Sequence, residues 1–301
     1  MKPAPFDYFT PATLDEALAL LAEHGADAKP LAGGQSLIPA MNFRLARPAA
    51  LVDLNRIGEL SYIRSERDGR GGGATAIGAM TRQRTAERSA VVARAAPLLA
   101  EAMPSIAHPQ IRNRGTVGGS IAHADPSAEL PAVMLALDAR FRAKSSTGER
   151  SIPAGEFFKG LLETALEPGE LLVEIAVPPL LPRSGTAFLE LARRHGDYAL
   201  VGVAAVVTLD ARGRCTAARI TFLSVGDGPV LATEAGKTLA GQTPSEELLR
   251  AAADAAAMRD VDPPSDIHAS AAYRRQLVAV LTRRALARAF ERAGSPATLD
   301  D

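Results

Sequence analysis

The chain has 301 residues, 47% of them hydrophobic and 23% charged, which is the balance of an ordinary globular protein of about two domains. Lys and Arg together number 34, as do Asp and Glu, so the net charge gives no reason to expect nucleic acid or an anionic membrane as a partner. The first residues lack the apolar segment of a signal peptide, and no later run is long and uncharged enough to span a bilayer, so we expect a cytoplasmic protein without membrane insertion.

Residues 1 to about 56 predict a small α/β unit. A helix is expected over 14–24, because Thr13 and Glu16 form a capping box and apolar residues recur behind it at helical spacing. The other expected elements are a strand over 28–31, a short helix that opens at Ser36 and runs through Met41 to Leu45, and a buried strand over 50–54.

Residues 57–178 predict a second unit of short strands and helices. Glycines over 67–73 indicate a hairpin turn, followed by a returning strand over 74–79. The remaining expectations are helices over 81–89 and 92–103 with a boundary or interruption at Pro97, a loop over 112–120, a helix with Pro126 in its first turn that runs to Leu137, and strands over 140–144, 149–152 and 170–177.

Prolines 178, 179 and 182 predict a domain boundary, which divides the chain into domains over 1–178 and 179–301, the first with subdomains of about 1–56 and 57–178. The second domain is expected to hold a three-stranded antiparallel sheet and a helical bundle. Its strands are predicted over 186–193, 198–209 and 214–225, and its helices over 231–240, 245–258 and 269–293.

The candidate site is a pair of glycine-rich segments. In Ala32-Gly33-Gly34-Gln35-Ser36-Leu37, a strand runs into two glycines and a hydroxyl residue then opens a helix. Glycine lets a ligand approach the backbone without a Cβ in the way, and free N–H groups at a helix start favour an anion. Thr116, Gly118, Gly119 and Ser120 repeat the design after two arginines. Two such segments suit a diphosphate, although neither has the spacing of a Rossmann or NTPase phosphate loop.

Cys215 is the single cysteine, which excludes an internal disulfide, a cysteine-held iron–sulfur cluster and a cysteine-rich zinc site in this chain. The five histidines have none of the spacings of a metal motif, so no metal ion is expected here. Any redox chemistry must therefore use a cofactor that is held in another way.

The chain resembles the FAD-binding medium subunits of molybdenum hydroxylases, which include the carbon monoxide dehydrogenase medium chain and the FAD subunits of the xanthine dehydrogenase family. The segments that carry the resemblance extend over nearly the whole chain: Phe6-Asp-Tyr-Phe-Thr-Pro11, Ala32-Gly-Gly-Gln-Ser-Leu37, His108-Pro-Gln-Ile-Arg-Asn-Arg-Gly-Thr-Val-Gly-Gly-Ser120, His123-Ala-Asp-Pro126, Gly196-Asp-Tyr-Ala199 and Ser270-Ala-Ala-Tyr-Arg-Arg275.

The resemblance implies an α+β flavoprotein with a PCMH-type (vanillyl-alcohol-oxidase-like) FAD-binding domain of two α/β subdomains and a C-terminal domain. It places the FAD diphosphate and ribityl chain at 32–37 and 116–120, and Asp125, Glu129, Leu172 and Tyr198 near the cofactor. Glu129 stands where relatives often have Asp. Leu189 stands where a lysine occurs in some relatives, so charge-based tuning from that position is not expected.

Several of these residues allow two interpretations. Arg112 and Arg114 either neutralise the diphosphate or fix the loop by bonding carbonyls. His123 and Asp125 are better explained by fixing a loop than by catalysis, because no nucleophile lies near them in sequence. Tyr198 either stacks on the flavin or fills a core. Cys215 is expected to be a buried small hydrophobe.

The resemblance further implies an electron-transfer subunit of a heterotrimer. It would take electrons from [2Fe-2S] clusters on a small subunit and pass them to NAD, a quinone or another acceptor, while a large molybdopterin subunit oxidises the substrate. No catalytic residue is expected in this chain, since the flavin carries the chemistry. The alternatives are a self-contained FAD-dependent oxidase or dehydrogenase of the vanillyl-alcohol-oxidase type, and a scaffold subunit that has lost FAD. Neither the substrate nor the acceptor can be predicted from this chain.

Overall fold

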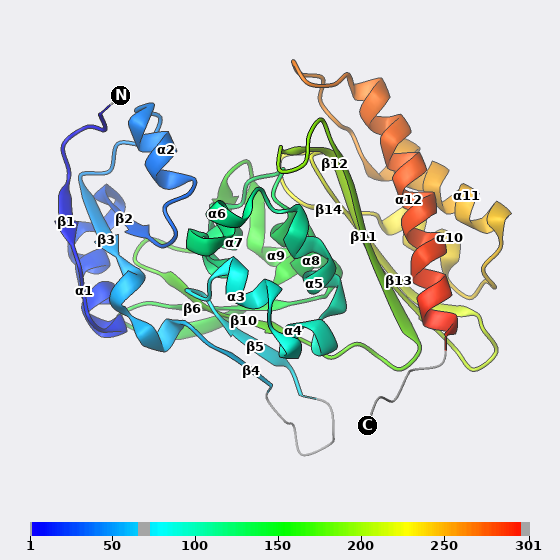
Figure 1. Cartoon of the computed structure of the whole chain (residues 1–301), viewed down its shortest axis with the longest axis horizontal. Coiled ribbons are helices and arrows are strands. Elements are labelled where there is room, and N and C mark those ends of the chain that lie inside the picture. The colour runs from blue at the N-terminus through cyan, green and yellow to red at the C-terminus, as the bar shows by residue number, and fades with distance from the viewer. Residues whose placement is uncertain (1, 66–72, 296–301) are drawn as a thin grey trace.

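The computed structural model, which describes residues 2–65 and 73–295, is built on three main sheets (Figure 1). The predicted turn over 67–73 falls outside the described residues except for Gly73. The first sheet lies near the N-terminus, the second lies in the middle of the molecule under a layer of helices, and the third lies beside the long C-terminal helix. The mixed α+β class expected from the sequence is therefore confirmed.

The first unit is a three-stranded parallel sheet with the strand order β1-β3-β2. The predicted helix and strands are confirmed, because the Thr13 hydroxyl caps the helix at Glu16 N and the helix buries Leu14 and Leu18 in the core of this unit. The strand β1 was not predicted. The elements are β1 (Asp7–Phe9), α1 (Leu14–His24), β2 (Ala28–Leu31), α2 (Leu37–Asn42) and β3 (Ala50–Asp53).

The second unit is an antiparallel sheet with the order β4-β5-β10-β6-β7, with helices over one face (Figure 1). Its strands are β4 (Ile63–Ser65), β5 (Thr75–Gly78), β6 (Arg140–Lys144), β7 (Glu149–Pro153) and β10 (Leu171–Val177), and β8 (Phe158–Gly160) pairs with β9 (Glu163–Thr164) apart from it. Its helices are α3 (Gln83–Glu87), α4 (Ala90–Ala95), α5 (Pro97–Ala102), α6 (Pro109–Arg114), α7 (Val117–His123), α8 (Glu129–Ala136) and the one-turn α9 (Ala154–Phe157).

Three predictions for this unit need correction or refinement. The region 112–120 is not a loop, because α6 ends at Arg114 and α7 begins at Val117. The glycines inside α7 do not break it, since the absence of a side chain at Gly118 is what allows the helix to touch Ala79. Pro97 is a boundary and opens α5. Pro126 precedes α8 and does not lie in its first turn.

The third unit is an antiparallel sheet with the order β11-β12-β13-β14. Three of its strands were predicted, and the fourth has two residues that pair with the end of β13. The elements are β11 (Ser184–Ala192), β12 (Ala199–Leu209), β13 (Cys215–Leu223), β14 (Val230–Leu231), α10 (Thr233–Leu239), α11 (Glu246–Ala255) with a π-helical extension over 256–260, and α12 (Ala271–Gly294).

The third unit is joined to the second by hydrogen bonds and packing along one seam. The Thr221 hydroxyl donates to Ala132 O at 2.7 Å, and Ser224 N donates to Pro126 O at 2.8 Å. Arg292 on α12 pairs with Glu101 on α5 at 2.7 Å. The residues that follow α7 are therefore held against the third sheet, which places the predicted polar residues 125 and 129 at this seam.

Candidate functional site

The two predicted glycine segments lie against each other. An ideal Cβ on Gly33 would lie 2.5 Å from Arg114 O and 2.7 Å from Gly115 Cα, and one on Gly119 would lie 3.4 Å from Ala32 Cβ. These distances leave no room for a side chain at Gly33. The structure therefore brings together two segments that belong to different units of the fold.

The first segment presents a row of unused backbone donors. Within the described residues, the N–H groups of 33–37 donate no hydrogen bond, although Ile38 N already bonds Gly34 O at 3.2 Å. Gly34 has a φ of 72°, which glycine adopts without strain, and Gln35 Nε2 donates to Gly33 O at 3.1 Å. Because α2 has six residues, its dipole is short, and the anion-binding character comes from the loop amides.

The second segment uses its amides differently. Val117 N donates to Thr81 O and Gly118 N to Ala79 O, both at 2.9 Å. Gly119 N donates to the Thr116 hydroxyl at 3.0 Å, and Ser120 N donates to Thr116 O at 3.2 Å. The start of α7 is therefore fixed to the second unit, and it offers a ligand the Ser120 hydroxyl and the bare surface of Gly119 in place of amides.

The two arginines before α7 have different roles. Arg112 is buried, with a side chain 5% exposed, and it bonds Glu87 at 2.9 Å and Ile106 O at 2.6 Å. For Arg112 the loop-fixing interpretation is therefore supported. Arg114 is exposed. Burial alone would raise the pKa of Asp53, but hydrogen bonds from Tyr8 and Asn55 hold that pKa below its usual value, and the positive charge of Arg114 adds to their effect. Within the described residues the Arg114 side chain bonds no carbonyl that would fix the loop, and its role beside a diphosphate stays a prediction.

A cluster of acidic groups lies along the seam between the second and third units. Glu129 on α8 is 8% exposed, and burial, reinforced by the charge of Asp125, raises its pKa to about 7 against the opposing effect of Arg112. On β11, burial and then the charge of Glu129 raise the pKa of Glu190 to about 8. Partial desolvation and the neighbouring Asp125 carboxylate raise the pKa of Tyr198 to about 12, although the residue as a whole is exposed. Glu129 and Glu190 are therefore more easily protonated than ordinary carboxyl groups.

The remaining predicted residues are placed as follows. Tyr198 is 67% exposed, which rules out the core-filling interpretation. Leu172 lies in β10 with its side chain in the core of the second unit, beside a register shift. Cys215 is buried and free, as expected. Among the described residues, no three His, Cys, Asp or Glu side chains form a group that could hold a metal ion.

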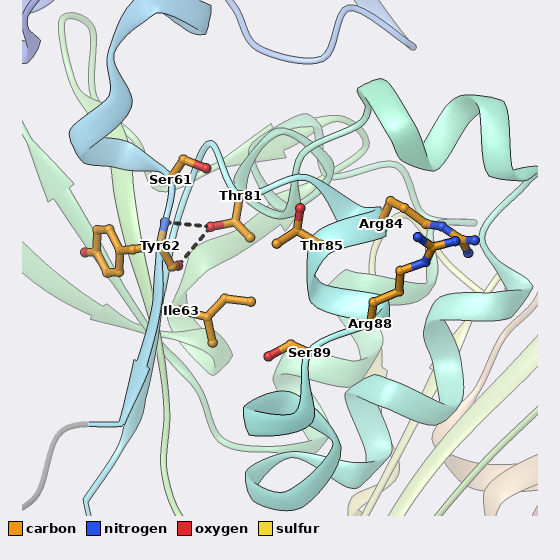
Figure 2. Close-up of a pocket in the computed structure, with 8 residues that line it drawn as sticks. All are labelled: Ser61, Tyr62, Ile63, Thr81, Arg84, Thr85, Arg88 and Ser89. Atoms are coloured by element: carbon orange, nitrogen blue, oxygen red, sulfur yellow. Dashed lines mark hydrogen bonds between the residues drawn. The ribbon is translucent and has the colours of Figure 1, made fainter.

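A cavity of about 590 Å³ is lined by Thr81 together with residues 61–63, 84, 85, 88 and 89 (Figure 2). The Thr81 hydroxyl closes one wall by bonding Tyr62 N at 3.1 Å and Tyr62 O at 2.9 Å, while Arg84 and Arg88 lie across the cavity. Arg84 is paired with Glu87 at 2.8 Å. None of the predicted site residues lines this cavity.

Two family models match the chain. Residues 4–180 match the FAD binding domain in molybdopterin dehydrogenase, and residues 186–289 match the CO dehydrogenase flavoprotein C-terminal domain. The chain belongs to the FAD-binding medium subunits of the molybdenum hydroxylases. The resemblance on which the sequence prediction rested is thereby confirmed.

The relatives described next cover nearly the full length of this medium subunit. It is 48% identical to the 6-hydroxypseudooxynicotine dehydrogenase complex subunit alpha of Paenarthrobacter nicotinovorans, with 97% of each chain covered. It is 41% identical to caffeine dehydrogenase subunit beta of Pseudomonas sp. (strain CBB1), again with 97% of each covered. Carbon monoxide dehydrogenase from Hydrogenophaga pseudoflava has a similar structure, with a TM-score of 0.92, 41% identity, and coverage of 97% of this chain and 99% of that one.

The medium subunit carries an FAD-binding domain, and its relatives are oxidoreductase subunits of multi-subunit complexes. The glycine segments fit such a cofactor, because a row of unused amides lies beside an exposed arginine where no Cβ intervenes. In the described part of the chain, no helix combines the length and the apolar character needed to cross a bilayer.

Proposed function

We propose that the FAD diphosphate lies on the amides of Gly33, Gly34, Gln35, Ser36 and Leu37. The observation that carries this proposal is that these consecutive donors are unused within the described residues although they adjoin the tightly packed contact with Arg114 and Gly115. A row of convergent N–H groups stabilises a phosphate oxygen with charge-assisted hydrogen bonds. Ala32 forms the base of this segment, and its Cβ would lie 3.4 Å from a Cβ on Gly119.

The second segment supplies the opposite wall of the site. Thr116 caps α7 and fixes Gly119, Gly118 packs on Ala79, and the Ser120 hydroxyl is the polar group offered to the cofactor. The flavin ring is then expected along the seam, with Asp125, Glu129 and the exposed Tyr198 beside it and the backbone of Leu172 beneath. The raised pKa of Glu129 keeps that carboxyl partly protonated at neutral pH, so it can donate as well as accept a hydrogen bond.

We further propose that this subunit is the electron relay of a cytoplasmic heterotrimer. FAD supplies both one-electron and two-electron chemistry, and the chain supplies its position and electrostatic surroundings. The electrons would arrive from [2Fe-2S] clusters on a small subunit and leave to NAD, a quinone or another acceptor, while a large molybdopterin subunit oxidises the substrate. The single cysteine of this chain supports that division, since it leaves no ligand set for a cluster here.

The diphosphate site is tested by adding one methyl group. Gly33→Ala places a Cβ 2.5 Å from Arg114 O, so the two segments must separate, and we expect at least a tenfold loss of FAD affinity in a fluorescence titration of the full chain. Gly58→Ala is the matched control, because a Cβ there meets nothing within 4 Å. Equal flavin content in the Gly33→Ala variant and the control would refute the site.

The relay function is tested with the same preparation. The isolated FAD-loaded chain should not be reduced by nicotine-type, purine or aldehyde substrates, whereas the assembled complex should reduce its flavin with its own substrate. Reduction of the isolated chain by an organic substrate would favour a self-contained dehydrogenase. A chain that takes up no FAD after reconstitution would favour a scaffold subunit.

A further inference from the structure

We propose that Asn55 and Arg82 are positioning residues that hold the two FAD-binding segments at a fixed separation. Neither belongs to a glycine segment. The proposal rests on the assignment of the FAD diphosphate to these segments, and it explains how segments from two different units of the fold keep one geometry.

The observation is a continuous chain of hydrogen bonds across the back of the site. Asn55 Nδ2 donates to Ala32 O at 2.9 Å, at the base of the first segment. Asn55 Oδ1 accepts from Arg82 Nη2 at 2.6 Å. Arg82 Nη1 in turn donates to Arg114 O, at the entrance to the second segment. We call this series of hydrogen bonds the Asn55–Arg82 brace.

The brace is anchored in the first sheet. Asp53, at the end of β3, accepts from Asn55 N at 2.9 Å and from Asn55 Nδ2 at 2.5 Å. The hydroxyl of Tyr8 on β1 donates to the other oxygen of Asp53. The amide of Asn55 is therefore oriented by a carboxylate that is itself fixed from a neighbouring strand, which leaves its oxygen directed at Arg82.

The other end of the brace is anchored in the second unit. Gln83 N, next to Arg82, donates to Gly115 O at 2.9 Å, and Val117 N donates to Thr81 O at 2.9 Å. The backbone on both sides of Arg82 is thus paired with the backbone on both sides of Thr116. A shift of Arg82 would move the start of α7, and with it Gly119 and Ser120.

The carbonyl that receives Arg82 is the same atom against which Gly33 packs. Arg114 O lies 2.5 Å from where a Cβ on Gly33 would be. The brace therefore acts at the point of closest approach between the two segments, where a displacement of a few tenths of an ångström changes the width of the site.

A second explanation would make Arg82 a simple counter-charge for the diphosphate. A substitution by lysine distinguishes the two explanations. The Arg82 guanidinium bonds Arg114 O and Asn55 with two different nitrogens, whereas a lysine keeps the positive charge but has a single nitrogen. Arg82→Lys is therefore expected to weaken FAD binding if Arg82 is a brace and to leave it unchanged if Arg82 is a counter-charge.

The experiment measures the FAD dissociation constant of the full apo chain by flavin fluorescence for wild type, Arg82→Lys, Asn55→Ala and the double variant. We expect each single variant to bind FAD about 10-fold more weakly and the double variant to bind no more than about 20-fold more weakly, since both changes break the same link. Arg88→Lys, which changes an exposed arginine in the lining of the separate cavity (Figure 2), is the matched control and should bind as wild type does.

The thermal midpoint of each apo chain is measured in parallel. Weaker FAD binding by Arg82→Lys with an apo midpoint within a few degrees of wild type supports the brace. Wild-type affinity in Arg82→Lys overturns it, and so do independent, multiplying losses in the double variant. If Asn55→Ala fails to fold, the comparison of Arg82→Lys with Arg88→Lys decides alone. A wild-type chain that binds no FAD would instead overturn the proposed site.

Discussion

Replacing Glu190 by Gln should make the protein more stable above neutral pH. One oxygen of this carboxylate, Oε2, is buried without a hydrogen-bond partner within the described residues. Burial and the charge of Glu129 raise the pKa of Glu190 to about 8, against an opposing hydrogen bond from Ser105. Because its ordinary value is 4.5, the folded protein binds the proton more tightly than the unfolded chain, and stability falls as the pH rises from about 4.5 to about 8.

The size of the effect follows from the difference in proton affinity. Each tenfold change in proton affinity between the folded and unfolded states is worth about 1.36 kcal/mol. A pKa of about 8 in place of 4.5 therefore lowers the stability of the folded protein by at most about 5 kcal/mol above pH 8. Glu190 is partly exposed, so solvent screens its charge, and we expect Gln to recover about 2 kcal/mol near pH 9 and nothing near pH 4.5. For a chain of this size that corresponds to roughly 5 °C in the midpoint of thermal unfolding.

The assay is thermal unfolding of the wild type and the Glu190→Gln variant across this pH range, followed by circular dichroism. Glu163→Gln, which removes an exposed carboxylate, is the control and should change the midpoint equally at every pH. A stabilisation by Glu190→Gln that stays constant from acid to alkaline pH would refute the reasoning. So would a lower stability of the variant at high pH, because it would mean that the ionised carboxylate has a favourable partner.

Two further predictions test the roles assigned to single residues. Arg112→Met should cost about 2 kcal/mol of stability in denaturant unfolding, because it leaves the buried Ile106 carbonyl without its partner and leaves Glu87 with Arg84 alone, and it should leave the FAD affinity of the folded chain nearly unchanged. A large loss of affinity at unchanged stability would assign Arg112 to the cofactor. Tyr198→Ala should leave stability within about 0.5 kcal/mol, since the ring is exposed, but should raise the fluorescence of bound flavin if the ring stacks on it.

The sequence predicted those elements whose signals are local. The bounds of α1 agree with its prediction because a capping box and a C-terminal glycine lie within the segment itself. The strand β1 was missed because Asp7–Phe9 is short, and its strand character comes from parallel pairing with Ala50–Val52. Pairing between residues so far apart leaves no local pattern.

The prediction for 112–120 was wrong because glycines were taken as breakers of secondary structure. In isolation a Gly-Gly pair weakens a helix. Here Gly118 allows α7 to pack on Ala79, and the helix is stabilised by the hydrogen bonds of Val117 and Gly118 to the end of β5. Tertiary contacts therefore override the local preference, as is common for short helices.

The glycine segments were found from sequence, but the residues that join them were not. Asn55 follows β3 and Arg82 precedes α3, and nothing in their spacing distinguishes them from other polar residues. Their importance depends on carbonyl groups of Ala32 and Arg114, which come from two other parts of the chain. The role of Asn55 and Arg82 can therefore be recognised from the three-dimensional structure and not from the sequence.

The arrangement of donors also bears on how FAD contributes to stability. The amides of α7 are paired with residues 79–81 of the second unit, whereas the amides of 33–37 belong to the first unit and are unused within the described residues. A ligand that bonds the free amides while resting against α7 bridges the two units, and it stabilises their association by an amount set by its concentration relative to its dissociation constant, about 2.7 kcal/mol at a hundredfold excess. If the cofactor completes the link between the first and second units, adding FAD should increase the protection of the first unit from hydrogen exchange more than that of the third unit. If the brace alone held the first and second units together, FAD would change the protection of the first and third units equally.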